Sequence, residues 1–332
     1  MTLVRGESSG LLYADRVTFM AADTSAATVS STAHAPSVRF EHLTKTYPDE
    51  VRAQWSLLQL PRTRKGLSAK RDHPECSGRP AVAVEDVTLS IPAGSLTVLV
   101  GSSGSGKTTL LRSVNRMVTP TSGRVLIDDT DVAALDAVKL RRTIGYVMQE
   151  SGLLPHRRVI DNIATVPRLN GVPKVAAHER CYELMGLVGL DPQLATRYPA
   201  ELSGGQQQRV GVARALAASP RLLLMDEPFG ALDAQTRVVM QEELVKLARK
   251  NPRTVLFITH SVEEAVYLAD RVVIMTSRPG KIKEIIDVKT VREQENWDKH
   301  TKIEDVMDLE SFVHLRTRIW KSLREEHAGT DH

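Results

Sequence analysis

The sequence predicts an α/β protein with a parallel sheet covered by helices. Four short apolar runs support this prediction, at residues 96–100, 222–225, 255–258 and 272–275. Strands that are buried on both faces of a parallel sheet are continuously apolar. Helical patterns separate the later runs, and alternation of strands with helices is typical of such a sheet. A glycine-rich turn follows the first run and leads into a further helical segment, which is the context of a phosphate-binding loop.

The composition argues against several classes of protein. The 332 residues are 42% hydrophobic and 25% charged, which are ordinary values for a globular protein of one large or two modest domains. The formal net charge of +4 is too small to predict nucleic-acid binding, which needs basic residues clustered on one face. The two cysteines, Cys76 and Cys181, lack the spacing of a zinc site or a disulfide framework, so we expect a reducing compartment.

The chain contains no segment typical of membrane insertion or secretion. No apolar run is long enough to cross a bilayer, and the N-terminal residues lack the apolar stretch of a signal peptide. We therefore expect a soluble or peripheral protein on the cytosolic side. Residues 1–36 are expected to be disordered, because 22–36 are rich in Ala, Ser and Thr without a period. The sequence leaves open whether Met1 or Met20 is the start.

A basic segment at residues 48–80 interrupts the regular pattern. Six basic residues occur from Arg52 to Arg71, and no acidic residue occurs between Val51 and Arg71. Charge runs of this kind usually form solvated loops, so we interpret the segment as a basic insertion loop. A second interpretation is a patch that contacts anionic lipid or a membrane partner.

The remaining regular elements follow from the spacing of apolar residues. Strands are expected at 38–43, 82–84 and 87–91. Residues 150–205 are more helical in pattern. At the C-terminal end, apolar residues recur near helical spacing over 309–323, which predicts an amphipathic helix that packs on the core.

Residues 101–108 match the phosphate-binding pattern GxxxxGK[ST]. A chance glycine-rich turn is the weaker interpretation, because the motif lies between a strand and a helix. Its glycines let backbone N–H groups turn onto phosphate oxygens, and the helix N-terminus adds its positive end. Lys107 would reach the β- and γ-phosphates, and Thr108 would give a hydroxyl to Mg²⁺. The residues expected to hold the nucleotide are Gly101, Ser102, Ser103, Gly104, Ser105, Gly106, Lys107, Thr108 and Thr109.

Two acidic residues, Asp226 and Glu227, follow the apolar run 222–225. A buried carboxylate at the end of a strand can hold Mg²⁺ or its water shell, which is the role expected of Asp226. Glu227 is then placed to polarise the attacking water as a general base. An acidic pair alone is usually surface charge, and the phosphate-binding loop upstream favours the functional interpretation.

A second potential anion site lies at Leu-Ser-Gly-Gly-Gln, residues 202–206, at the head of the helical stretch 206–217. One nucleotide does not need two such sites in one subunit, whereas a dimer does. With the run 202–216, the chain resembles the ATP-binding subunits of ABC transporters over roughly residues 37–280. The resemblance implies a P-loop NTPase (RecA-like) core with an antiparallel β subdomain and an inserted α-helical subdomain at 150–205, followed by a C-terminal helical extension over 281–332.

The resemblance also implies roles for further residues. Tyr47 would stack on adenine, and Asp233 would lie in a loop at the dimer contact. Gln149 would sense Mg²⁺ and the membrane partner, and His260 would contact the γ-phosphate, so that both join Glu227 in catalysis. The residues that would cover the nucleotide of a second subunit are Ser203, Gly204, Gly205 and Gln206.

The family's mode of action implies several partners. Two ATP molecules would be sandwiched in a head-to-tail dimer, with a second, identical ATPase subunit as the expected partner. Transmembrane permease subunits and an extracytoplasmic solute-binding protein would complete an import system, and this chain would lie peripherally on the cytoplasmic face of the inner membrane. We expect no nucleic-acid partner.

Two branches of importers are resembled by different segments. Residues 152–171 and 206–212 resemble importers of glycine betaine and other quaternary amines. Residues 259–270, 277–281 and 315–320 resemble importers of nitrate, sulfonate and taurine. We favour the quaternary amine, because the resemblance to its importers lies partly in the helical segment. The family resemblance implies that this segment faces the membrane partner.

Two functions outside solute import compete with this interpretation. A non-transport ABC ATPase usually has two cassettes or a long coiled coil, and the sequence shows neither. A P-loop kinase would share the phosphate-binding loop, but residues 202–206 argue against it.

Overall fold

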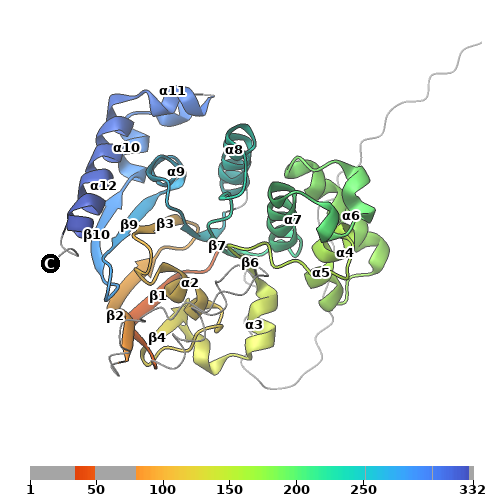
Figure 1. Cartoon of the computed structure of the whole chain (residues 1–332), viewed down its shortest axis with the longest axis horizontal. Coiled ribbons are helices and arrows are strands. Elements are labelled where there is room, and N and C mark those ends of the chain that lie inside the picture. Colours follow the sequence, from red (N-terminus) through yellow and green to blue (C-terminus); the bar gives the residue numbers. More distant parts are fainter. Residues whose placement is uncertain (1–33, 49–79, 251, 301, 329–332) are drawn as a thin grey trace, which may run out of the picture.

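The computed structural model describes residues 34–48, 80–250, 252–300 and 302–328 (Figure 1). The disorder expected for 1–36 falls, up to residue 33, outside the described residues. The basic insertion loop expected at 48–80 lies outside them as well, apart from its two end residues.

A six-stranded sheet forms the centre of the protein, in the order β10-β9-β3-β8-β7-β6. Every pairing from β9 to β6 is parallel, and β10 adds an antiparallel edge. This confirms the predicted α/β class. The six strands are β3 (Leu96–Gly101), β6 (Ile144–Val147), β7 (Leu222–Asp226), β8 (Thr254–Ile258), β9 (Arg271–Met275) and β10 (Ile282–Asp287).

The continuous apolar runs are explained by two hydrophobic cores, one on each face of this sheet. In β7, Leu223 and Met225 belong to one core, and Leu222 and Leu224 belong to the other. Successive side chains of a strand point to opposite faces, so a strand covered on both sides needs an apolar residue at every position.

A smaller antiparallel sheet, in the order β2-β1-β4-β5, packs on one of these faces and forms the expected β subdomain. The two strands expected at 82–84 and 87–91 are one kinked strand, β2. At the kink, Asp86 takes a φ of 49°, which breaks the regular alternation of side chains. The four strands are β1 (Val38–Tyr47), β2 (Ala81–Ile91), β4 (Ser122–Ile127) and β5 (Thr130–Asp131).

Short helices build a separate helical group, which Figure 1 shows to one side of the central sheet. The helix α7 (Gly204–Leu216) contacts α4 and α6 in this group, and it also contacts β6 of the sheet. The other members are α4 (Val159–Ile163), α5 (Thr165–Leu169), α6 (Lys174–Leu187), and the 3₁₀ turns η2 (Pro192–Thr196) and η3 (Pro199–Glu201).

The two faces of the central sheet are covered by different helices. On the side of the β subdomain lie α2 (Lys107–Val114), α3 (Ala137–Thr143) and the 3₁₀ turn η1 (Val132–Ala134). On the other side lie α8 (Ala234–Lys250) and α9 (Val262–Leu268). The phosphate-binding loop thus joins a central strand to a buried helix.

The C-terminal part continues the core. Strand β10 lies beyond residue 280 and still pairs with β9. The apolar spacing predicted near 309–323 forms α12, which packs on α9 and β9 and buries Phe312 and Ile319. The last elements are α10 (Lys289–Gln294), η4 (Trp297–Lys299), α11 (Ile303–Met307) and α12 (Glu310–Ala328). No helix among the described residues is both long and apolar enough to span a membrane.

Candidate active site

The loop between β3 and α2 is shaped by glycines that no other residue could replace without a shift. Gly106 has a φ of 82°, and a Cβ added there would lie 2.5 Å from Val84 Cγ2 and 2.7 Å from the carbonyl oxygen of Ala83. A Cβ added at Gly101 would lie 2.8 Å from the carbonyl oxygen of Met275. The loop therefore packs tightly against both the β subdomain and the strand β9.

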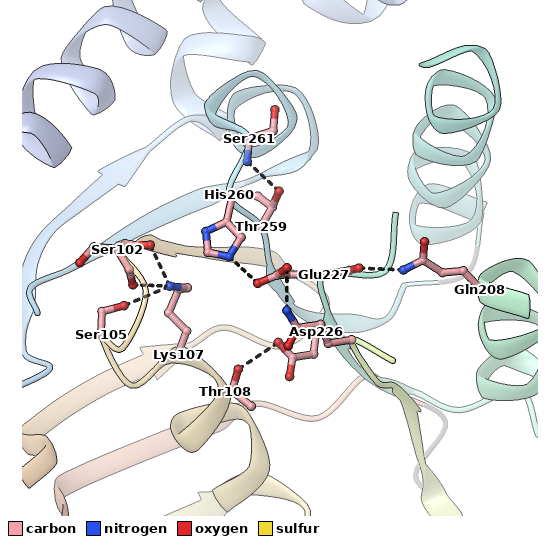
Figure 2. Close-up of polar contacts among 12 residues, drawn as sticks. Ser102, Ser105, Lys107, Thr108, Gln208, Asp226, Glu227, Thr259, His260 and Ser261 are labelled. Carbon is pink, nitrogen blue, oxygen red and sulfur yellow. Dashed lines mark hydrogen bonds and ion pairs between the residues drawn. The ribbon is translucent and has the colours of Figure 1, made fainter. Parts of the chain in front are cut away.

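Lys107 closes this loop from the inside (Figure 2). Its Nζ donates hydrogen bonds to the carbonyl oxygens of Gly101 at 2.8 Å and Ser102 at 2.9 Å, and to Ser105 Oγ at 3.1 Å. Burial lowers the pKa of the Lys107 amine, while Glu227 and Asp226 oppose that shift. A buried ammonium surrounded by loop oxygens is a suitable partner for the negative charge of a phosphate.

The start of α2 offers unpaired backbone donors at the same place. Gly106 is the N-cap of α2 and supplies no side-chain oxygen, so the first N–H groups of the helix have no partner within it. Ser103 and Gly104 are exposed at the tip of the loop, whereas Thr108 and Thr109 lie in the first helical turn. Such a helix start attracts anions through its N–H groups and its dipole.

A hydroxyl and a carboxylate meet beside the loop. Thr108 Oγ1 donates a hydrogen bond to Asp226 Oδ1 at 3.1 Å. The second carboxylate oxygen of Asp226, Oδ2, is buried and has no hydrogen-bond partner. Burial raises the pKa of Asp226, and the hydrogen bond from Thr108 opposes that shift. A buried oxygen without a partner is costly for a protein, so Asp226 is suited to a cation.

The oxygens of Thr108 and Asp226 fit Mg²⁺. This ion is usually held by one or two protein oxygens, and waters and phosphate oxygens complete its coordination. Within the described ranges, no group of three or more His, Cys, Asp and Glu side chains could hold a metal by itself.

Glu227 lies at the centre of a hydrogen-bonded group drawn from three strand ends (Figure 2). Gln149, which follows β6, donates from Nε2 to Glu227 Oε2 at 3.1 Å. His260, which follows β8, has its Nε2 at 2.5 Å from Glu227 Oε1. The strands β6, β7 and β8 are neighbours and parallel, so their carboxyl ends bring these three residues together.

Residues 203–206 form a separate part of the candidate site. Ser203 caps α7, since its Oγ accepts a hydrogen bond from the Gln206 N–H at 3.2 Å. In return, Gln206 Oε1 accepts a hydrogen bond from the Ser203 N–H at 2.9 Å. Gly204 is exposed, and Gly205 is partly exposed. In the part of the chain that the structure describes, no hydrogen bond or ion pair joins these four residues to residues 101–109.

Two other expected site residues have local partners of their own. Asp233 precedes α8, and its carboxylate accepts hydrogen bonds from the Thr236 N–H at 3.0 Å and from Thr236 Oγ1 at 2.7 Å. These hydrogen bonds lower the pKa of Asp233. Tyr47 ends β1 opposite Ala81, and Lys45 Nζ lies 5.0 Å from the centre of its ring. The roles of Asp233 in dimer contact and of Tyr47 in adenine stacking stay predictions.

The structure adds a residue that the sequence did not single out. Gln208 is 4% exposed, and its side chain bonds to the backbone of the segment that begins at Glu227. It belongs to the run of three glutamines at 206–208, of which only the first received a role. The signal available in the sequence was an uncharged polar residue at a helix position that faces the core.

Comparison with known proteins agrees with these features. Residues 84–230 match the family model described as ABC transporter. A glycine betaine/carnitine/choline transport ATP-binding protein, OpuCA of Bacillus subtilis, is 46% identical over 237 residues, which are 71% of this chain and 61% of the relative. An uncharacterized ABC transporter ATP-binding protein of Methanocaldococcus jannaschii is 41% identical over 252 residues, which are 76% of this chain and 88% of the relative.

Among solved structures, a similar fold occurs in a dimeric ATP-binding cassette in a post-hydrolysis state bound to ADP and Pi. It is 28% identical with a TM-score of 0.62, and the match covers 76% of this chain and 98% of that one. For the first curated relatives, by contrast, the match spans 53–61% of their length.

The loop geometry generates a binding prediction for Lys107. Replacing Lys107 with Met removes the buried ammonium, so we expect the affinity for ATP to fall by about 100-fold, equivalent to about 2.7 kcal/mol. Titration of the purified chain with a fluorescent ATP analogue measures this change. Lys139→Met is the matched control, because Lys139 is exposed on α3. Equal affinity in the Lys107→Met variant and the wild type would contradict the role of Lys107.

Proposed function

The chain belongs to the ABC transporter family of ATP-binding proteins, and on that premise we propose that it hydrolyses ATP to power import of a solute through a membrane permease. The observation that carries the proposal is the placement of Glu227. Gln149 and His260 bind its carboxylate on two sides, and the Thr108–Asp226 pair and the loop around Lys107 belong to the same site.

Nucleotide binding is supported by the loop at 101–109. The N–H groups at the start of α2 and the ammonium of Lys107 would hold the β- and γ-phosphates. Thr108 and Asp226 would hold Mg²⁺. When bound there, Mg²⁺ would neutralise negative charge on the phosphate oxygens.

The hydrolytic step is assigned to Glu227. Its carboxylate would take a proton from the water that attacks the γ-phosphate, which is general-base catalysis. Gln149 and His260 would orient that carboxylate, since each donates to or contacts one of its oxygens. His260 would also face the γ-phosphate. It follows β8, the phosphate loop follows β3, and these parallel neighbouring strands end at the same edge of the sheet.

The separation of residues 203–206 from the phosphate loop supports a dimer. We assign the capped start of α7, with its exposed Ser203 and Gly204, to the nucleotide held by a second copy of the chain. A head-to-tail arrangement of two copies would complete two sites, and the solved relative that holds ADP and Pi is also a dimer.

The quaternary-amine branch is favoured for the solute. The B. subtilis relative is named for transport of glycine betaine, carnitine and choline, in agreement with the resemblance of residues 152–171 and 206–212. The partners would be permease subunits and an extracytoplasmic solute-binding protein, with this chain peripheral on the cytoplasmic face of the inner membrane. Nitrate, sulfonate or taurine import is the second candidate, on the residues of 259–270, 277–281 and 315–320.

The role of Glu227 predicts a separation of binding from turnover. A Glu227→Gln variant keeps the size of the side chain and one of its two acceptor oxygens but loses the base. We expect hydrolysis to fall by about 100-fold or more while ATP binding is retained. Phosphate release measures turnover. Light scattering after size-exclusion chromatography measures ATP-dependent dimer formation, which reports the retained ATP binding. Glu179→Gln, on the exposed side of α6, is the control, and wild-type turnover in Glu227→Gln would contradict the assignment.

The solute assignment predicts a selective loss of uptake. In cells that carry Glu227→Gln in place of the wild-type chain, uptake of labelled glycine betaine should be lost and uptake of taurine and nitrate retained. Loss of taurine or nitrate uptake instead would favour the second candidate. Unchanged uptake of all three solutes would contradict import of either class.

A further inference from the structure

A buried glutamine joins α7 to the backbone that carries Glu227. Gln208 Nε2 donates a hydrogen bond to the carbonyl oxygen of Glu227 at 3.0 Å, and Gln208 Oε1 accepts one from the Ala231 N–H at 2.7 Å. Figure 2 shows the amide reaching from α7 to Glu227. With 4% of the residue exposed, water cannot replace either bond at little cost.

The backbone of Glu227 needs such support because its conformation is strained. Its φ is 49°, a value that residues with a side chain adopt only where the surroundings enforce it. On one side, its N–H donates to the carbonyl oxygen of Ile258 at 3.0 Å. On the other side, its carbonyl oxygen accepts from the Gly230 N–H at 3.2 Å and from Gln208. Gln208 is thus the contact that ties this conformation to a helix outside the sheet.

The same helix begins at the residues assigned to the second nucleotide. Ser203 caps α7, and Gln208 lies about one turn beyond Gly204 and Gly205. An α-helix is stiff over this length, so a displacement of its first turn would be passed to the side chain of Gln208. The bond from Gln208 would then move the carbonyl group of Glu227.

We propose that Gln208 is a positioning residue. Its side chain holds the backbone of the general base Glu227 in a fixed position relative to the start of α7. The inference rests on the proposed function, in which Glu227 acts on water and residues 203–206 cover the nucleotide of a second copy. In that dimer, α7 of one chain would supply part of the site around the partner's nucleotide. Gln208 connects this α7 to Glu227, the base of its own chain. Glu227 would be correctly placed only while the start of α7 lies against the nucleotide of the second copy.

The neighbouring glutamine offers a matched comparison. Gln207 Nε2 donates to the carbonyl oxygens of Pro199 at 3.0 Å and Leu202 at 3.3 Å, and Gln207 Oε1 accepts from Ser151 Oγ at 3.2 Å. Gln207 therefore makes bonds of the same kind from the same helix, but to the loops of the helical group rather than to the segment that begins at Glu227.

The first test replaces Gln208 with Met, which keeps the length of the side chain and removes both hydrogen bonds. We expect kcat for ATP hydrolysis to fall by about 10–100-fold and KM to change by less than about 3-fold, because only the placement of the base is altered. Gln207→Met should keep kcat within about 3-fold of the wild type. Thermal melting of both variants compares their folding.

The second test uses Gln208→Glu, which does not depend on the folding of the Met variant. A protonated carboxyl group at this position can donate to the Glu227 carbonyl oxygen, whereas a carboxylate cannot. Burial raises the pKa of a carboxyl group. The carboxyl group of the Gln208→Glu variant should therefore gain its proton within the pH range of the assay. The ratio of kcat in Gln208→Glu to kcat in the wild type should therefore rise as the pH is lowered from about 8 to about 6.

The outcomes separate the inference from the proposed function. Wild-type kcat in folded Gln208→Met, an equal loss in Gln207→Met, or a ratio for Gln208→Glu that does not change with pH would each overturn the role of Gln208. A wild-type chain that hydrolyses no ATP, or an active Glu227→Gln variant, would instead contradict the proposed function and remove the premise of the inference.

Discussion

The parallel pairing of β3, β8 and β7 is the constraint on which the candidate site depends. Ile258 of β8 lies opposite Leu99 of β3 on one side and opposite Asp226 of β7 on the other. Parallel strands in one register end at the same edge of the sheet. The phosphate loop, Glu227 and His260 follow these three strands, so they meet although they are far apart in the sequence. Any slip in this register would separate the base from the loop.

The second constraint belongs to the proposed function, in which each chain offers two separate parts of a nucleotide site. The loop around Lys107 and the carboxylates beyond β7 lie together, whereas the capped start of α7 has no hydrogen bond to that loop among the described residues. In the proposed dimer, each nucleotide joins parts of two chains. Gln208 is the contact within one chain that connects its two parts, which gives a physical route from one site to the other.

The sequence was sufficient for features with a local signal. Continuous apolar runs predicted the buried strands, and the glycine-rich motif predicted the loop at 101–108. The edge strand β10 was not predicted, because its residues are half exposed and its partner is set by the sheet. Gln208 was not predicted either, since its role depends on a contact with a residue 19 positions away. Its core-facing position on the helix is visible in the local pattern, but the backbone groups that it binds are not.

The central claim is that each site needs two chains, and a mixture of two inactive variants tests it most directly. Lys107→Met breaks the phosphate loop, and Ser203→Arg blocks the start of α7. In a mixed head-to-tail dimer, one site carries both defects and the other carries none. The account predicts that each variant alone is inactive and that an equal mixture regains up to about a quarter of wild-type hydrolysis, since half of the dimers are mixed. A mixture as inactive as its components would contradict it.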